Sequence, residues 1–313
     1  MNTNEVTSNK GQVTRIQSAV GGLLVLAAAI LALSGFGCPV WAEDKASETP
    51  EVPAQQLEGF NLNGYTDTGK KAWEINGDKA DISDENIKVT NVNANFYNPK
   101  QNANLTSKTG TIDKVNGNVH LQDDVVVVAQ ERGTTMTTDS LNWDRNQDLV
   151  TTKDLVTIED QQGTVTGTGL TAHPTLKTAQ LNEDVKAVIN TAKDTASSVT
   201  SAQTVEITCD GSMQMDQMKI YAVFHDNVVA VEASTGRQLY ADKMEVWFDE
   251  KNKKIKKVIC TGNVKVVQGN NASYAEKMTY DGIDETLTMS GRPKMVFDTG
   301  DNKGKGMFQQ LGK

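Results

Sequence analysis

Residues capable of acid–base, nucleophilic or metal chemistry are few in this chain and lie far apart in the sequence. The three histidines, His120, His173 and His225, are separated from one another and from every cysteine. No HExxH, CxxC, GxSxG, P-loop or GxGxxG pattern occurs in a context that would support catalysis. Two carboxylate pairs, Asp123–Asp124 and Glu159–Asp160, are typical of turns and strand edges. The sequence therefore predicts no catalytic residue, no metal site and no cofactor.

Other charged residues fit local structural roles. Three aspartates, Asp81, Asp139 and Asp242, each follow a small residue and precede a strand-like segment. A carboxylate in that position most often accepts hydrogen bonds from nearby backbone N–H groups. The one concentrated basic segment predicts a solvated hairpin tip, with a lipid head group or a protein partner as the alternative contact; it comprises Lys251, Lys253, Lys254, Lys256 and Lys257.

Two cysteines lie beyond the N-terminal segment, and they leave two alternatives open. Cys209 and Cys260 could form a disulfide, because exported proteins reach an oxidising compartment. They could instead be buried free thiols at strand positions, since Cys260 ends a β-prone run just before a turn. The choice depends on whether the strands bring the two Cα atoms within bonding reach.

The N-terminus predicts an export signal. Lys10 and Arg15 precede an uncharged run from Ile16 to Ala42, which ends on the small and branched residues that signal peptidase requires. We expect cleavage after Ala42. A retained membrane anchor is the main alternative, because the whole run is long enough to span a bilayer. Lipidation at Cys38 is a third possibility.

The overall charge argues against two classes of partner. The chain has 40 acidic and 31 basic side chains and a net charge of −9. Nucleic-acid binding depends on neutralising phosphates, so no nucleic-acid partner is expected. An acidic surface also gives no general attraction to anionic lipid head groups.

A short sequence motif recurs along the chain. It consists of a pair of acidic, asparagine or glycine residues, followed by valine, a variable residue and an apolar one. The spacing of about 30 to 42 residues fits one hairpin-like layer per copy, with each layer burying its apolar face against its neighbours. We interpret each copy as a turn that opens a half-buried strand. The copies begin at Gly117, Asp154, Glu183, Asp226 and Gly262, with a variant at Gly291.

A second template supports an all-β fold. The segments Tyr240–Asp249 and Tyr274–Asp281 alternate apolar and polar residues with period 2, and Thr138–Asp144 follows the same pattern loosely. Aromatic residues make up only 5% of the chain. No segment beyond the N-terminus shows a sustained helical period, so we expect an all-β protein.

These motifs resemble those of lipopolysaccharide-transport proteins. The C-terminal half closely resembles the OstA/LptA family in the stretch Tyr240–Val296, where turn, strand and the Gly291-x-Pro293 motif occur in order. The N-terminal half resembles LptC more weakly. That resemblance rests on Gly69–Ile75, Gly77–Asp81, Gly117–Val119, Leu141–Asp144 and Gly163–Leu170.

The resemblance implies an open antiparallel β-jellyroll, a V-shaped trough of two sheets, in two consecutive modules. It also implies a non-enzymatic periplasmic conduit that carries lipopolysaccharide from the inner to the outer membrane, with the lipid A acyl chains in the trough. The implied partners are the inner-membrane lipopolysaccharide ABC transporter and the outer-membrane translocon. Predicted lining residues are Val119, Leu121, Val156, Ile158, Val185, Val228, Met244, Val246, Phe248, Val264, Val266, Met278, Tyr280, Leu287 and Met289.

The chain differs from either family alone because it joins both parts in one polypeptide. The expected division is a signal peptide or anchor at 1–42, a flexible linker at 43–56, an LptC-like jellyroll at 57–190, an OstA/LptA-like jellyroll at 191–300 and a flexible tail at 301–313. Residues alone favour a closed β-sandwich core over an open trough, and the resemblance reverses that preference.

Two rival functions remain at this stage. One is a secreted β-solenoid that binds or cleaves polysaccharide, although a lyase needs a carboxylate cluster with a basic residue. The other is a scaffold without a lipid ligand.

An open jellyroll leaves unpaired edge strands that accept another strand. We expect head-to-tail self-association through an edge that includes Pro293, Met295 and Phe297, with Phe60–Tyr65 as its N-terminal counterpart.

Overall fold

The structure is a computed structural model of the 313-residue chain that describes residues 55–66, 68–97, 102–130, 133–160, 163–174, 176–190, 204–249, 255–284 and 286–298. The regular elements in these ranges are all strands, and none of the described residues belongs to a helix that could cross a membrane. The predicted signal or anchor, almost all of the predicted linker and the predicted tail lie outside these ranges.

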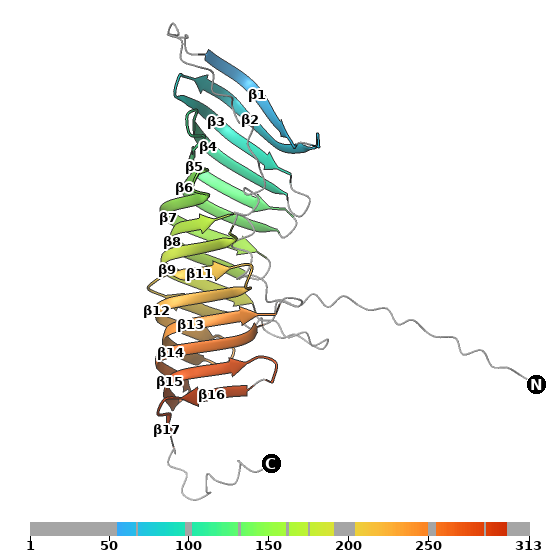
Figure 1. Cartoon of the computed structure of the whole chain (residues 1–313). Coiled ribbons are helices and arrows are strands. Elements are labelled where there is room, and N and C mark those ends of the chain that lie inside the picture. The colour runs from blue at the N-terminus through green and yellow to red at the C-terminus, as the bar shows by residue number, and fades with distance from the viewer. Residues whose placement is uncertain are drawn as a thin grey trace, which may run out of the picture.

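The described residues form seventeen strands (Figure 1). They are β1 (Gln55–Tyr65), β2 (Lys71–Ile82), β3 (Asn86–Phe96), β4 (Ala103–Asp113), β5 (Val119–Ala129), β6 (Thr134–Asp144), β7 (Leu149–Asp160), β8 (Gly163–His173), β9 (Thr178–Asn190), β10 (Thr204–Cys209), β11 (Met213–Asp216), β12 (Tyr221–Glu232), β13 (Arg237–Phe248), β14 (Ile255–Gln268), β15 (Asn271–Asp281), β16 (Thr286–Ser290) and β17 (Lys294–Val296).

The strands form one antiparallel meander. Each strand pairs with the next one from β1 to β9 and from β12 to β15. Strands β10 and β11 both lie between β9 and β12, and β16 and β17 both pair with β15. Among the described residues, β1 pairs with β2 alone and no strand joins β1 to β17, so this part of the sheet is open at both ends. The all-β, open antiparallel prediction is confirmed.

Most strands bend near their middle, and the bends line up along one long side of the stack (Figure 1). The hydrogen-bond register shifts there, for example between Gln122 and Val125, between His225 and Val228 and between Thr261 and Val264. Such β-bulges let a strand turn sharply. Each bent strand therefore contributes to both arms of a folded sheet.

Residues with left-handed backbone conformations build these bends. Asp123, Asp184, Asp226 and Asn263 have φ values of 64°, 51°, 64° and 47°. Asparagine and aspartate adopt this region more readily than other side chains that carry a Cβ. From the sequence, we interpret each copy of the repeated motif as a turn that opens a strand. That interpretation is wrong for four copies, which lie inside β7, β9, β12 and β14: those at Asp154, Glu183, Asp226 and Gly262.

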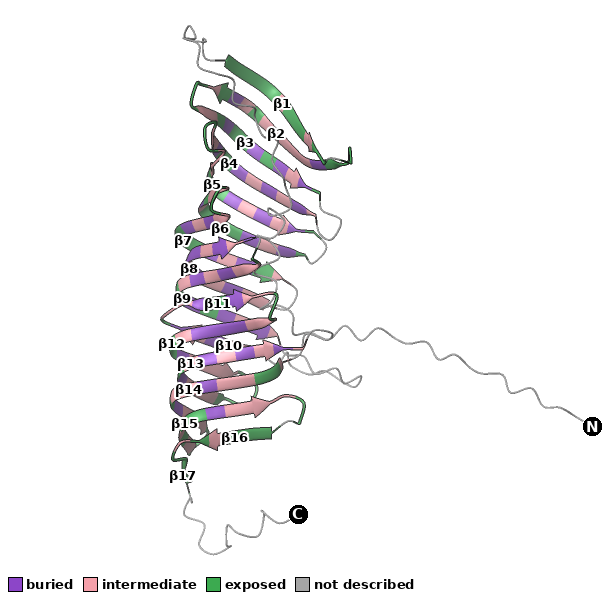
Figure 2. Cartoon of the chain, viewed as in Figure 1, coloured by how far each residue is buried: buried purple, intermediate pink, exposed green. Residues whose placement is uncertain are grey.

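One face of the folded sheet is apolar and buried (Figure 2). Strand β7 shows the pattern, because Val150, Thr152, Val156 and Ile158 are all buried while the residues between them are more exposed. Buried apolar residues from both arms form one core cluster that runs from β2 to β15. Burial decreases toward both ends, where β1 and β17 are almost entirely exposed.

Candidate functional site

The apolar inner face, defined as the buried side of the folded sheet, is the largest chemically distinct surface of the protein. The strand registers bring the predicted lining residues of the C-terminal half together: Met244, Cys260, Met278 and Met289 stand opposite one another on consecutive strands. A parallel row contains Val246, Val258, Tyr280 and Leu287.

Most of the predicted lining residues lie on this face. The buried ones are Leu121, Val156, Ile158, Val185, Val228, Met244, Val246, Phe248, Val264 and Met278. Val119, Val266 and Met289 are half-buried and pack against the core cluster. Tyr280 is half-buried, and Leu287 is exposed because β16 is at the open end of the sheet. Lipid binding by these residues stays a prediction.

Sequence reasoning missed the middle of the inner face. Its largest fully buried side chains include Met136, Leu170, Leu181, Met213 and Phe224. The alternating burial in Thr134–Asp144 marks the strand of Met136, but Tyr221–Glu232 shows no such alternation around Phe224. The repeated motif directed the prediction toward the residues beside the bends.

The inner face can hold hydrocarbon. Burial of an alkyl chain against it contributes about 0.8 kcal/mol per methylene. In this conformation its middle is closed, because side chains such as Phe224 and Leu170 are 0% exposed. The ends differ, since Leu62 in β1 and Met295 in β17 are exposed. Occupancy of the middle by a lipid therefore requires the two arms to separate.

Buried hydroxyl groups interrupt the apolar lining of β6. Thr134 and Thr138 are 0% and 6% exposed, and their Oγ1 atoms have no hydrogen-bond partner among the described residues. Both residues alternate with Met136 on the inner face.

The two cysteines are free and buried. Strands β12 and β13 lie between Cys209 on β10 and Cys260 on β14. Adjacent strands are about 4.8 Å apart, so three steps place the two residues roughly 14 Å apart, well beyond the reach of a disulfide. The disulfide alternative is therefore wrong for this structure. Burial raises the pKa of the Cys260 thiol to about 12 and that of Cys209 to about 11.

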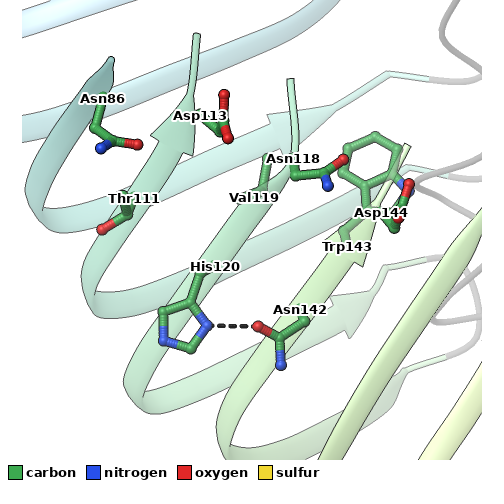
Figure 3. A pocket seen from close by; sticks show the side chains of 9 residues that line it. All are labelled: Asn86, Thr111, Asp113, Asn118, Val119, His120, Asn142, Trp143 and Asp144. Atoms are coloured by element: carbon green, nitrogen blue, oxygen red, sulfur yellow. Dashed lines mark hydrogen bonds between the residues drawn. The ribbon is translucent and has the colours of Figure 1, made fainter. Parts of the chain in front are cut away.

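In the described part of the chain, no group of three or more His, Cys, Asp or Glu side chains could hold a metal ion. His120 is exposed, and its Nδ1 lies 2.7 Å from Asn142 Oδ1 (Figure 3). It lines a pocket of about 210 Å³ together with Asn86, Asp113 and Asp144. Asp113 Oδ1 and Asp144 Oδ1 accept turn N–H groups, from Val115 and Gln147, so both carboxylates have structural roles.

Other predictions for charged residues need correction. Asp81 accepts hydrogen bonds from the side chains of Gln56 and Lys79, and Asp242 accepts one from Asn263 Nδ2, so these bonds come from neighbouring side chains rather than from local backbone. Asp123–Asp124 lies inside β5 at a bend, not at a turn or edge. In the basic segment, residues 251–254 lie outside the described ranges, while Lys256 and Lys257 are exposed in β14.

The predicted assembly edges lie at opposite ends of the stack. Phe60–Tyr65 is part of β1, and Met295 is part of β17. Met295 and Phe297 are 58% and 54% exposed.

Comparisons with known proteins agree with the repeated architecture. The sequence profile of the family described as "Lipopolysaccharide-assembly, LptC-related" matches residues 22–190, which is more than half of the chain. The profile described as "LptA/(LptD N-terminal domain) LPS transport protein" matches residues 206–310. Strand β9, at the end of the first match, pairs with β10 and β11 of the second part. The predicted combination of an LptC-like and an LptA-like part is confirmed.

One similar solved structure is that of LptH from Pseudomonas aeruginosa, described as the LptA homologous periplasmic component of the conserved lipopolysaccharide transport device. The match has 13% sequence identity and a TM-score of 0.28, and it covers 54% of this chain and 97% of LptH. No curated protein sequence matches the chain.

Proposed function

Because the chain belongs to the LptC-related family of lipopolysaccharide-assembly proteins and has a role in lipopolysaccharide transport, we propose that it acts as a non-enzymatic conduit in the periplasm. In this proposal the acyl chains of lipopolysaccharide occupy the inner face and move along it from the inner-membrane ABC transporter toward the outer-membrane translocon. The energy for extraction comes from that transporter.

The observation that supports a conduit is the continuity of the apolar inner face. One cluster of buried side chains extends from β2 to β15 without interruption at the β9–β10 junction, where Ala187 and Ile207 stand opposite each other. A lipid could therefore pass from the LptC-like part to the LptA-like part of the same polypeptide. The covalent link keeps the second part at a high local concentration near the first.

Self-association is the second element of the proposal. The exposed edges at β1 and β17 each have unpaired backbone groups, and such edges accept a strand from another molecule. Head-to-tail addition of β17 to the β1 of a second copy would extend the inner face. Deletion of residues 291–313 is expected to abolish oligomers in sedimentation experiments while β-structure by circular dichroism is retained. Unchanged oligomers would contradict this joint.

Site-specific photo-crosslinking tests the conduit. A photoreactive residue at Val246 or Val264, both buried on the inner face, should crosslink to lipopolysaccharide. The matched control is Lys243, which stands one strand position from buried Met244 and points to the other face. Equal labelling at the inner and outer positions would contradict the proposal, provided that circular dichroism shows each variant to be folded.

The closed middle of the inner face supports a second candidate, a scaffold without a lipid ligand. Phe224 and its neighbours are fully buried, as in an ordinary β-sandwich core. The scaffold predicts no crosslinking to lipopolysaccharide at Val246 or Val264 even when the protein is saturated with lipid.

A further inference from the structure

Four of the hairpin tips along one long edge of the sheet share one construction. Each of these tips joins the end of one strand to the start of the next on the side opposite the bends. An aspartate at the first position accepts a backbone N–H of the turn at Asp113, Asp144 and Asp216, with N···O distances of 2.7, 3.0 and 3.0 Å. Asp281 does the same for Ile283 N at 2.9 Å. The repeated turn fixes which residues lie at each tip.

Hydrogen bonds also connect most neighbouring tips, and we call this row of tips the lip. The Lys114 amide donates to Glu85 O, and the Gln217 amide donates to Lys177 O. Further contacts run from Arg145 N to Asn118 Oδ1, from Phe248 N to Ile220 O and from Gly282 N to Lys256 O.

Four successive tips on this lip each bring one cation, and at the fifth Lys256 and Lys257 follow in β14. We name five of these residues together the cationic lip; its members are Lys114, Arg145, Lys177, Lys219 and Lys256. Lys219, 2.8 Å from Asp216, is the one member that forms an ion pair within the described part of the chain. The aspartates that cap the turns stand beside the cation at three of the tips, and turn N–H groups engage their carboxylates. The described tip residues at the two ends of the lip, Asp84 and Glu85 at one and Asp284 at the other, have no cation beside them.

An exposed apolar side chain adjoins the cation at three of these tips. Val115 follows Lys114, Leu176 precedes Lys177 and Met218 precedes Lys219. The three apolar residues are 87%, 64% and 69% exposed. A cation beside an apolar group is the arrangement that proteins use at the boundary between hydrocarbon and charged head groups.

The spacing of the cations suits an extended anionic ligand. Successive tips are two strands apart, so the cations recur at roughly 10 Å intervals. That interval is close to the screening length at physiological salt, so that the fields of neighbouring cations overlap. A single exposed ion pair is weak, but several acting on one ligand add up.

We infer that the cationic lip binds the phosphate-bearing head group of the amphiphile whose acyl chains lie on the inner face. This inference rests on the proposed conduit function, because the lip borders the space between the two arms. The lip holds the anionic groups while Val115, Leu176 and Met218 cover the first carbons of the chains. The head group thereby moves from one cation to the next as the lipid advances.

A pair of charge-matched triple variants tests this inference. The first carries Lys114→Gln, Lys177→Gln and Lys219→Gln at the lip. The control carries Lys108→Gln, Lys153→Gln and Lys186→Gln, which removes the same charge from outer positions near the bends. The full chain would be titrated with phosphorylated lipid A, with dephosphorylated lipid A, with inorganic phosphate and with anionic phospholipid vesicles.

The expected result is specific to the lip and to the lipid phosphate. The lip variant should bind phosphorylated lipid A about tenfold more weakly at low salt, and the difference should shrink as salt rises. The control variant should bind like the wild type, and neither variant should change binding of dephosphorylated lipid A. Inorganic phosphate should not compete at millimolar concentration.

Several outcomes would overturn the inference. Equal losses of affinity for phosphorylated lipid A in the two triple variants would show a general effect of net charge. Loss of vesicle binding with unchanged binding of lipid A would assign the lip to a membrane surface, and competition by inorganic phosphate would assign it to the free anion. A wild-type protein that binds no lipid A in any form would instead contradict the proposed function itself. Thermal unfolding by circular dichroism would confirm that both variants are folded.

Discussion

The two long edges of the folded sheet hold charged side chains for different physical reasons. At the bends, acidic and amide side chains occupy backbone positions that need left-handed conformations, as at Asp123 and Asp226. At the lip, aspartates cap the turns, and Lys114 and Lys219 occupy tip positions without a left-handed backbone, whereas Lys177 has a φ of 57°.

Many of the carboxylates at the bends form hydrogen bonds or ion pairs with neighbouring side chains. Asp124 pairs with Lys108 at 2.6 Å, and Asp154 accepts a bond from Ser140 Oγ at 2.5 Å. Asp210 likewise accepts a bond from Asn227 Nδ2 at 2.8 Å. Two lip cations are engaged as well, because Lys114 Nζ donates to Ser83 O and Lys219 pairs with Asp216. The charges at the bends and at the tips therefore both contribute to the fold, and our proposal adds that the lip cations also meet a ligand.

The largest expected difference between the bends and the lip is in the rate at which a cysteine thiol reacts. Cys209 and Cys260 lie on the inner face directly before the bends at Gly211 and Gly262. Burial raises the pKa of Cys260 to about 12, so at pH 8 it should react with a maleimide or disulfide reagent about a thousandfold more slowly than an ordinary thiol. A Met218→Cys variant at the exposed lip should react at the ordinary rate.

The same measurement checks the absence of a disulfide. After unfolding without reductant, Cys209 and Cys260 should both be labelled, because both thiols are free. Mass analysis of the peptides assigns each label, since the full sequence also contains Cys38. Rapid labelling of Cys209 or Cys260 in the folded protein would contradict a closed inner face beside the bends.

Alanine substitution of two glycines compares a bend with a hairpin tip. Both glycines have a left-handed backbone, so the conformational strain of adding a Cβ is similar at the two positions. Gly262 at a bend and Gly236 at a hairpin tip have φ values of 77° and 65°. A Cβ at Gly262 would lie 2.2 Å from the Asp242 carboxylate, whereas a Cβ at Gly236 meets nothing within 4 Å. We expect Gly262→Ala to lower the free energy of unfolding by about 2 to 4 kcal/mol and Gly236→Ala by about 1 kcal/mol.

Urea denaturation of both variants would measure this difference. Equal decreases in the free energy of unfolding for the two variants would show that the bend accommodates the added methyl group by moving Asp242. The comparison with wild type also requires an unchanged urea dependence, because a changed slope would mean that the variant unfolds from a different state.

The sequence was sufficient to predict the fold class and a set of inner-face residues beside the bends and in the C-terminal half. Period-2 alternation in Tyr240–Asp249 correctly placed Met244, Val246 and Phe248 on one buried face. The resemblance to known transport proteins supplied the open, repeated arrangement, for which the residues alone favoured a closed sandwich.

The remaining errors have a common physical origin. Asp, Asn and Gly favour both hairpin turns and bulges, because both need left-handed conformations. The sequence pattern at Asp226–Asn227 therefore cannot distinguish a bend inside a strand from a turn between strands. Sequence reasoning missed the lip because its cations lie far apart in the sequence and become neighbours only when the strands stack. It singled out the concentrated lysines at 251–257 instead.

Acid titration of the tip caps should give the smallest effect. Hydrogen bonds from the backbone N–H groups of Asn116 and Val115 lower the pKa of Asp113 below its ordinary value of 3.8. A carboxylate with a lowered pKa in the folded state adds stability that is present above its ordinary pKa and is lost as the pH falls through the folded value. The tip at Val115 should therefore stay ordered at pH 4 and loosen at lower pH.

Nuclear magnetic resonance can follow both the Asp113 carboxyl group and the exchange of the Val115 amide. We expect a titration midpoint below 3.8 and faster amide exchange as the carboxylate is protonated. Asp113→Asn is the control, because its side-chain oxygen can still accept the same N–H groups but does not titrate in this range. A midpoint at or above the ordinary value would mean that the turn does not depend on the charged cap. The position of Lys114 at the lip would then be set by the tip-to-tip hydrogen bonds rather than by its own turn.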